Sequence, residues 1–427
     1  MDFEMNLRRL SQLCATLMIA IAMVKTSFGQ GVYLQAGGPV NRSMGGASVA
    51  APIDAIGALY WNPASISGMA NSETAFSLDF LIPKHTVSSS VGPFAGTTES
   101  DSGSFAIPNI GFVQHIENRA MTFGVGVNTV AGFGTNLPAD PNNPVLAPAP
   151  FGLGQVNSSA LFIQIAPVLS VEINDQLSIA AGPTITTGRV SLEPFVFNSA
   201  NADGTYPTGQ GTRYHWGGGF QVGTFYILDD QWRFGASFKS PTWMEDFSFN
   251  GEDENGLPRK LAADIDLPMI LSVGTSYKAN EETLMALDVR FFDYANTRGL
   301  GDRAVFSSTG ALGGLDFSSV IASSLGVQRK VNEFFEVRAG YTYNQNPIKN
   351  SESFFNIASP VSLEHMLSTG ASLNFNKKIS ANVAYSHYFE NARSGQIIFP
   401  GIGAVPGSTV VNTISANLFD FGITVRH

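Results

Sequence analysis

The sequence has little charge and almost no cysteine. Charged residues make up 14% of its 427 residues, whereas an average soluble domain has about 25%. The net charge is −10, so the chain lacks the basic excess that nucleic-acid binding requires, and we exclude nucleic acid as a partner. The one cysteine, Cys14, lies in a segment that we expect to be removed. The mature chain then has no disulfide and no cysteine-based metal site or catalysis.

Long apolar runs are missing as well. Hydrophobic residues reach 44%, yet no run attains the roughly 18 residues that a membrane helix needs. The apolar run Leu13 to Val24 follows Arg8 and Arg9 and precedes a small-residue cleavage signal that ends at Gly29. This arrangement predicts a signal peptide over residues 1–29 and therefore an exported protein.

Motifs for catalysis and for metal or cofactor binding are the third absence. The histidines are scattered, and none stands in an HExxH motif or at tight metal-ligand spacing. Ser386 and His387 are sequence neighbours, so on a strand they would point to opposite faces and could not form a catalytic pair. No nucleophile elbow, phosphate loop or EF-hand pattern occurs. We expect neither an enzyme nor a cofactor or metal site.

The feature that the sequence does have is a regular alternation of apolar and polar residues. From Glu73 onward, apolar residues alternate with small, polar or charged ones in fourteen segments, as in the set Trp232, Phe234, Ala236 and Phe238. A period of two residues predicts strands with one apolar face. The expected strands lie at about 73–92, 103–116, 119–130, 159–172, 176–190, 213–228, 231–247, 264–279, 283–294, 320–331, 333–344, 363–375, 379–390 and 410–427.

The connections between these segments alternate between short and long without exception. Short ones include residues 117–118 and 174–175, and long ones include residues 131–158 and 295–319. Tight turns at one end and long loops at the other are typical of an outer-membrane barrel. The barrel must close because lipid cannot satisfy the open edge of a sheet. The predicted fold class is therefore all-β, a fourteen-stranded antiparallel transmembrane β-barrel over residues 73–427.

The stretch before the first strand is of a different kind. Residues 41–66 consist mostly of small residues and end in the turn Asn62-Pro63-Ala64, where Pro63 keeps Asn62 out of the helical region. A Gly/Ala-rich segment with an acidic residue, here Asp54, and an Asn-Pro-Ala turn before the first strand resembles the N-terminal hatch of the FadL family. Members of this family are outer-membrane transporters of long-chain fatty acids and other hydrophobic compounds. A loop-rich cap on another all-β protein is the alternative.

The resemblance extends over most of the remaining chain. It is carried by the stretches LSIAAGPTITTGRV, LPMILSVGTSYKANEETLMALDVRFFDY, VRAGYTYNQNPI and SFFNIASPVSLEHMLSTGASLNF. It implies a hatch (plug) over residues 30–72 inside the barrel lumen, the outer membrane of a Gram-negative-type bacterium, and a sideways opening at a kink in the third strand. One departure is the last residue, His427, where barrel proteins commonly have a Phe that the barrel assembly machinery reads.

The resemblance also implies a function. This is passive uptake of hydrophobic molecules, long-chain fatty acids foremost, by a monomer whose other partners are outer-membrane lipid and the barrel assembly machinery. Aromatic hydrocarbons or other lipophiles are alternative substrates. A general porin, and an adhesin or structural barrel, are alternatives of another class. A porin for polar solutes does not need a hatch, and an adhesin does not need cations beneath an apolar entrance.

Cations are expected among the side chains that face the lumen. If the apolar members of each strand face lipid, their neighbours face inward, and the candidate ligand-binding residues are Arg233, Lys239, Arg290 and Arg338. A buried cation could bind the carboxylate of a ligand, and arginine could do so through two hydrogen bonds. The alternative is that these side chains form salt bridges across a wet lumen and hold the hatch.

The loop at residues 131–158 is the second candidate region. It carries Phe133 and Phe151 among prolines and glycines. Because ligand pockets are mostly apolar, this loop could form an entrance for hydrophobic ligands. Ordinary packing of a proline-rich loop over the barrel mouth is the alternative.

The hatch itself contains the third group of candidates, Asp54 with Asn62, Pro63 and Ala64. One interpretation is a latch that holds the hatch to the wall and is displaced when ligand binds. The other is an Asx turn and a helix cap, which these residue types favour. We favour the structural interpretation for Asn62 and leave both open for Asp54.

Overall fold

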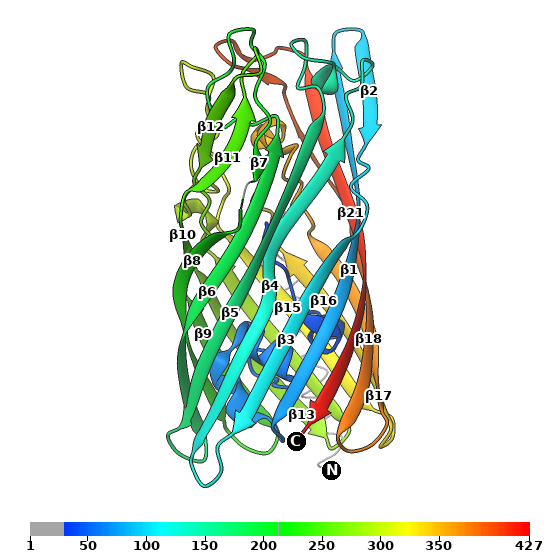
Figure 1. The fold of residues 1–427 in the computed structure, drawn as a ribbon. Coiled ribbons are helices and arrows are strands. Elements are labelled where there is room, and N and C mark those ends of the chain that lie inside the picture. The colour runs from blue at the N-terminus through cyan, green and yellow to red at the C-terminus, as the bar shows by residue number, and fades with distance from the viewer. Residues whose placement is uncertain (1–29, 212) are drawn as a thin grey trace.

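The structure is a computed structural model that describes residues 30–211 and 213–427. Its main feature is a closed antiparallel β-barrel (Figure 1). The main sheet of the described residues has 16 strands. Two of them are short and pair with one neighbour each, β2 (Phe94–Glu99) with β1 and β10 (Trp243–Met244) with β8, so fourteen strands make the wall. They are β1 (Glu73–Val91), β3 (Phe105–His115), β4 (Met121–Leu137), β5 (Val156–Glu172), β6 (Leu177–Glu193), β8 (His215–Ile227), β9 (Trp232–Lys239), β13 (Ile270–Asn280), β14 (Thr283–Phe292), β15 (Val320–Lys330), β16 (Phe335–Asn344), β17 (His365–Asn374), β18 (Ile379–Gly395) and β21 (Thr409–Arg426).

The strands follow one another around the wall in chain order, and β1 pairs with β21 to close the ring. The predicted fold class is therefore confirmed. Short turns lie at the lower end in Figure 1, where the chain also ends, and long loops lie at the upper end. The lower end is the periplasmic side and the upper end the external side of such a barrel. The predicted signal peptide, residues 1–29, lies outside the described residues.

The long external loops carry their own short elements. A small sheet is formed by β7 (Gln210–Gly211), β11 (Phe247–Glu252) and β12 (Pro258–Ala263), and a hairpin by β19 (Ile398–Phe399) and β20 (Gly403–Ala404). Four single 3-10 turns complete them, namely η2 (Pro144–Leu146), η3 (Tyr294–Asn296), η4 (Asn350–Glu352) and η5 (Phe354–Asn356).

Several strand ends differ from the prediction, and proline explains two of them. The strand expected at 231–247 ends at Lys239, because Pro241 follows and cannot donate to a ladder. The strand expected at 264–279 begins only at Ile270, two residues after Pro268. In the opposite direction, β4 continues to Leu137, well beyond the expected end at residue 130.

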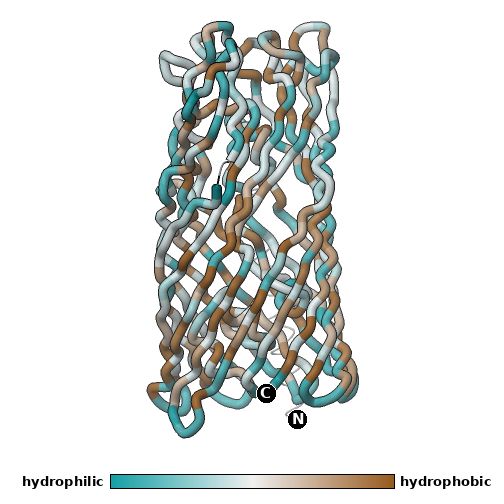
Figure 2. The backbone as a smooth tube through the Cα atoms, in the orientation of Figure 1, coloured by the Kyte–Doolittle hydropathy of each residue, from teal (hydrophilic) through white to brown (hydrophobic). Residues whose placement is uncertain are grey.

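The wall is apolar outside and polar inside, the reverse of a soluble protein. Phe234 and Val273 face outward with 41% and 56% exposure, whereas Ser237 and Ser272 face the lumen and are buried. Figure 2 shows apolar and polar residues alternating along the strands. Lipid outside and a filled lumen inside select this pattern. The helices of the described residues include none with the length and apolar character to cross a membrane.

Residues 30–72, here called the hatch, occupy the lower half of the lumen (Figure 1). The hatch contains α2 (Gly38–Ser43), α3 (Ala55–Trp61) and the 3-10 helix η1 (Pro63–Gly68). Its contacts are spread around the wall. Helix α2 meets β16, β17, β18, β21 and β1, helix α3 meets β1, β3 and β4, and η1 meets β4, β5, β6, β8 and β9. Small residues make this fit possible: a Cβ on Gly340 of the wall would lie 2.0 Å from the backbone nitrogen of Gly45.

Candidate ligand-binding site

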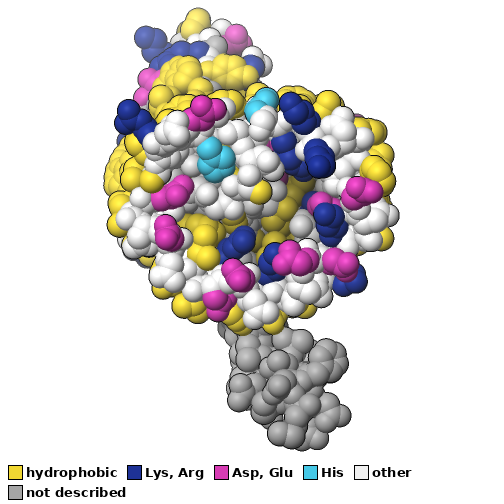
Figure 3. All heavy atoms as spheres, turned by 90° about the horizontal axis from the view of Figure 1, so that it is seen from below, with side chains coloured by type: hydrophobic (Ala, Val, Ile, Leu, Met, Phe, Trp, Pro, Cys, Tyr) yellow, Lys and Arg dark blue, Asp and Glu magenta, His cyan; other side chains and the backbone are white. Residues whose placement is uncertain are grey.

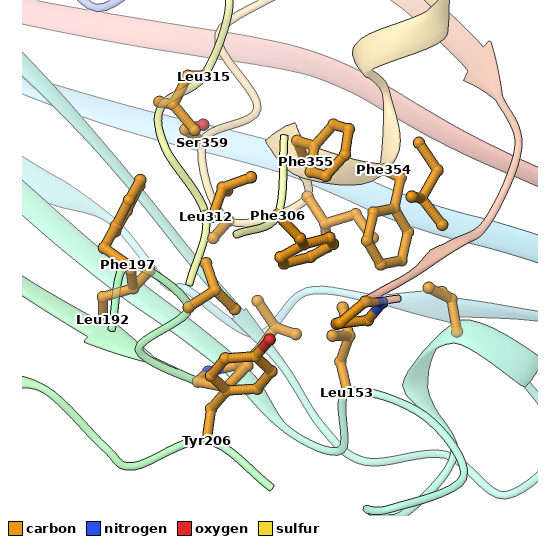
Figure 4. A pocket seen from close by; sticks show the side chains of 18 of the residues that line it. Leu153, Leu192, Phe197, Tyr206, Phe306, Leu312, Leu315, Phe354, Phe355 and Ser359 are labelled. Carbon is orange, nitrogen blue, oxygen red and sulfur yellow. The ribbon is translucent and has the colours of Figure 1, made fainter. Parts of the chain in front are cut away.

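An apolar cavity of about 190 Å³, here called the upper cavity, lies among the external loops. Side chains from several external loops converge on it, among them Leu153, Phe197, Phe306 and Phe355 (Figure 4). Tyr206 also lines it, and its hydroxyl donates to the carbonyl oxygen of Gly310 at 2.5 Å. Burial raises the pKa of Tyr206 to about 12, so the ring stays neutral. This cavity suits a hydrophobic molecule.

A second cavity of about 110 Å³, the lower cavity, lies between the start of the hatch and the wall. Residues 30–35 form one side, and β1, β3, β4, β5, β18 and β21 form the other. Its lining contains no charged residue among the described ones. Phe133 lines both cavities, so its ring lies between them.

The lower cavity lies where the wall is interrupted. Pairing of β3 with β4 ends at Asn109 and Asn128, although both strands continue. Just above, the register of β4 against β5 shifts between Thr129 and Ala131. The hatch takes over as partner, because the Leu34 N–H donates to Val130 at 2.8 Å and the Gly132 N–H donates to Val32 at 3.0 Å. The third barrel strand, β4, therefore has an irregular register at this point, and the sideways opening that the resemblance implies stays a prediction.

Lys239 lies above the hatch beside a group of aromatic rings. Its Nζ is 6.0 Å from the ring centre of Tyr33, 5.2 Å from that of Tyr60 and 5.9 Å from that of Trp61. Lys239 is buried, yet its side chain makes no hydrogen bond or ion pair with any described residue. Directly opposite on β8, both amide atoms of Gln221 are also unpaired within the described residues. Tyr33 also lines the lower cavity. Lys239 and Gln221 therefore lie next to the apolar path that the upper and lower cavities form.

Arg290 contacts the same indole ring but has hydrogen-bond partners at both terminal nitrogens, whereas its Nε has none among the described residues. Its guanidinium lies 3.7 Å from the ring centre of Trp61. It donates to Asp288 at 2.5 Å, to Ser324 at 3.0 Å and to the Gly46 carbonyl of the hatch at 2.6 Å. Asp288 in turn accepts from the backbone N–H groups of residues 48 and 49 at 2.7 and 3.0 Å. Arg290 thus holds the hatch, as the alternative interpretation of the lumen cations described.

Arg233 and Arg338 lie on the periplasmic side of the hatch, away from both cavities. They line a polar pocket of about 230 Å³ together with Asp54, Glu73 and Arg426. Figure 3, the view from below, shows charged side chains of both signs at this end. Each of the three side-chain nitrogens of Arg338 has a partner: they donate to Gln328, Ser372 and Glu336 at 2.7 to 2.8 Å. The four predicted cations therefore lie in three separate surroundings.

The predicted hatch residues act as caps and wall contacts. Asp54 caps α3 by accepting from the Gly57 N–H at 3.3 Å. Asn62 caps η1 through the Ala64 N–H at 3.1 Å. Its Nδ2 also donates to the Val49 carbonyl at 2.8 Å and to the Thr224 carbonyl of β8 at 2.9 Å. The structural interpretation of Asn62 fits, and the same side chain ties the hatch to the wall.

The turn that Asn62 begins lies hard against β8. A Cβ on Gly223 of that strand would lie 3.0 Å from Cδ of Pro63. Ala64 is completely buried beside Phe225. Phe151, the other predicted entrance residue, is 81% exposed and lines neither cavity.

Sequence reasoning did not single out the aromatic group of Tyr33, Tyr60 and Trp61, nor Gln221. Only the adjacent pair Tyr60 and Trp61, in a stretch made mostly of small residues, could have drawn attention to part of this group. The described residues contain no group of three or more potential metal ligands.

The fold and its apolar cavities are those expected of an outer-membrane transporter of hydrophobic compounds, and the family comparison establishes this class. Residues 19–412 match the family described as outer membrane protein transport protein (OMPP1/FadL/TodX), and the chain belongs to this family. No curated protein sequence matches the chain at a significant level.

Solved structures share the fold. A Pseudomonas aeruginosa FadL homologue has a TM-score of 0.72 and 16% identity, with 93% of this chain and 99% of that one covered. The P. putida toluene transporter TodX has a TM-score of 0.67 and 17% identity, covering 92% and 99%. The Ralstonia pickettii toluene transporter TbuX has a TM-score of 0.64 and 17% identity, also covering 92% and 99%. Identities this low establish the shared fold alone.

Proposed function

We propose that this protein takes up long-chain fatty acids by passive transport across the outer membrane, as a monomer and without a cofactor. The observation that carries the proposal is Lys239, a buried lysine without an anionic partner among the described residues that borders an apolar path. A buried ammonium without an acceptor is costly. A carboxylate that arrives with an alkyl chain would supply that acceptor while its chain occupies the apolar cavities.

The proposed path has three stages. The ligand first enters the upper cavity and then passes Phe133 into the lower cavity. Its carboxylate next approaches Lys239 and Gln221 past Tyr33, which contacts both the lysine and the lower cavity. Release then follows sideways, where β3 and β4 part. Displacement of residues 32–34 from β4 would widen that opening, because their hydrogen bonds replace those of β3.

Uptake of aromatic hydrocarbons is the second candidate. The size of the upper cavity favours it, because a cavity of about 150 Å³ is known to bind benzene. Two of the structures that share this fold are described as toluene transporters. A ligand without a head group would use the apolar cavities and leave Lys239 without a partner.

The test compares binding of oleate with binding of its uncharged methyl ester to the purified barrel in detergent. Lys239→Met should weaken oleate binding by about tenfold or more, the equivalent of one charge-assisted hydrogen bond, and leave the ester unaffected. Lys278→Met is the matched control, because Lys278 pairs with Glu281 at a periplasmic turn. Equal loss for acid and ester would contradict a carboxylate site.

Uptake in cells tests the transport class itself. Cells with and without the gene are given labelled oleate, labelled toluene and a sugar of similar size. Fatty-acid uptake predicts a gene-dependent signal for oleate, and hydrocarbon uptake predicts one for toluene. A gene-dependent signal for the sugar alone would identify a general porin.

A further inference from the structure

Two buried carboxylates face each other across the seam where the barrel closes. The seam is the pairing of β1, the first barrel strand, with β21, the last. Asp79 of β1 and Asp420 of β21 are direct partners in that pairing. Both side chains point into the lumen and are completely buried. Like charges directly opposite each other destabilise a strand pair, so this seam contains a built-in repulsion at its middle.

The hatch supplies the charge that offsets this repulsion. Arg42, at the end of α2, donates from Nε to Asp420 at 2.8 Å and from a terminal nitrogen to Asp79 at 3.1 Å. The same terminal nitrogen also donates to the Ala36 carbonyl within the hatch at 2.8 Å. The guanidinium is completely buried. One hatch residue therefore binds one carboxylate from each side of the seam.

Packing around Arg42 is also shared between the two sides. Helix α2 contacts β1 on one side of the seam and β21, β18 and β17 on the other. Gly422 of β21 leaves room for Pro39, since a Cβ there would lie 2.9 Å from Cγ of that proline. Asn109 of β3 donates to Asp79 at 3.0 Å and fixes the carboxylate from the β1 side. The binding site for α2 is therefore complete only when β1 and β21 are paired.

We propose that Arg42 couples the seating of the hatch to closure of the barrel in the correct register. A slip of one residue between β1 and β21 would turn Asp420 toward lipid, because side chains alternate between faces. A slip of two residues would move it by about 7 Å along the strand, beyond the reach of one guanidinium. Arg42 can therefore bind both carboxylates in one register only, and in that register it removes the repulsion at the seam.

The second buried pair of the hatch provides the contrast. Asp288 and Arg290 lie on the same strand, β14, on the far side of the ring from the seam. Their contacts with the hatch do not depend on which strands close the barrel. Loss of this pair should loosen the hatch without changing the seam.

Cysteine cross-linking in the full chain, expressed in cells, tests the proposal. Cys14 is the one native cysteine and lies in the predicted signal peptide. Leu78 and Phe421 are direct partners on the outer face of the seam, so the pair Leu78→Cys with Phe421→Cys reports the correct register. The pair Leu78→Cys with Phe419→Cys reports a slip of two residues. Protease sensitivity of residues 30–72 reports whether the hatch is seated.

Arg42→Met should lower in-register cross-linking by about tenfold or more, because it leaves two buried carboxylates without a cation. The hatch should also become sensitive to protease. The triple variant Arg42→Met, Asp79→Asn, Asp420→Asn should restore cross-linking to near the wild-type level. The double variant Asp79→Asn, Asp420→Asn should keep the seam in register but expose the hatch, because Arg42 is then buried without an anion.

Arg290→Met is the control, with a protease-sensitive hatch and unchanged seam cross-linking. The proposal is overturned if Arg42→Met cross-links like the wild type. Heat-modifiable migration on gels shows whether Arg42→Met yields a folded barrel. If it does not, the triple variant tests the proposal. Recovery of folded barrel in that variant supports the coupling, and failure to recover overturns it.

Discussion

Two buried cations of this protein lie beside the same indole ring and differ in every other respect. Arg290 donates to Asp288, Ser324 and the hatch backbone, and each of these contacts is short. Lys239 has aromatic rings around it and no hydrogen-bond acceptor among the described residues. A cation that is hydrogen-bonded to both the wall and the hatch, as Arg290 is through its two terminal nitrogens, fixes the structure. A cation without hydrogen-bond partners is available to a ligand. The two roles are therefore separated by the presence of hydrogen-bond partners and not by burial.

The largest effect is expected from Arg290→Met. It would leave Asp288 buried without its cation and remove the contact with Gly46, and loss of one partner of a buried pair costs about 3–5 kcal/mol. The free energy of unfolding in detergent, from urea titration, measures this loss. Arg329→Met provides the scale for an exposed pair, because Arg329 and Glu282 are both more than half exposed, and it should cost less than about 1 kcal/mol. Similar losses of unfolding free energy for the two variants would show that Arg290 does not hold the hatch more strongly than an exposed ion pair would.

A change of the opposite sign is expected from Lys239→Met in the ligand-free protein. Replacing a buried, unpaired ammonium by an apolar side chain of similar length should leave the free energy of unfolding unchanged or raise it by about 1 kcal/mol. The same urea titration measures it. A marked loss of stability would mean that Lys239 holds the aromatic group together, and its role would then resemble that of Arg290.

The smallest effect is expected from Gln221→Leu. The amide of Gln221 has no partner among the described residues, so its removal should not lower stability. If it contributes one neutral hydrogen bond to a bound carboxylate, affinity for oleate should fall by about threefold while affinity for the methyl ester stays constant. Calorimetric titration with both ligands separates these outcomes. A loss for the ester would assign Gln221 to the apolar lining instead.

The sequence predicts the wall well because one physical requirement dictates it. Lipid on one face and a filled lumen on the other impose a period of two residues, and that period is readable in sets such as Phe234, Ala236 and Phe238. It places Lys239 and Arg290 in the lumen correctly. The strand ends depend on proline instead, since Pro241 and Pro268 interrupt the ladder between β9 and β13, and only short bridges are found beside them.

The site is less predictable because it depends on where the hatch runs. Whether a lumen cation is paired depends on backbone atoms such as the Gly46 carbonyl and the N–H groups of residues 48 and 49. No pattern in the sequence positions those atoms against β14. The same holds for the predicted entrance loop. Phe133 lies on the extended end of β4 and lines both cavities, whereas Phe151 lies in the external loop and is exposed to solvent.

The contact between Gly45 of the hatch and Gly340 of the wall has a consequence for the cell. Backbone meets backbone there with no space for one further carbon atom, so the permeability barrier of this pore depends on side chains that are absent. A single methyl group at either position would act as a wedge. Such a wedge would lift the hatch from the wall, so the plug can be loosened here by adding one carbon atom and without altering any charge.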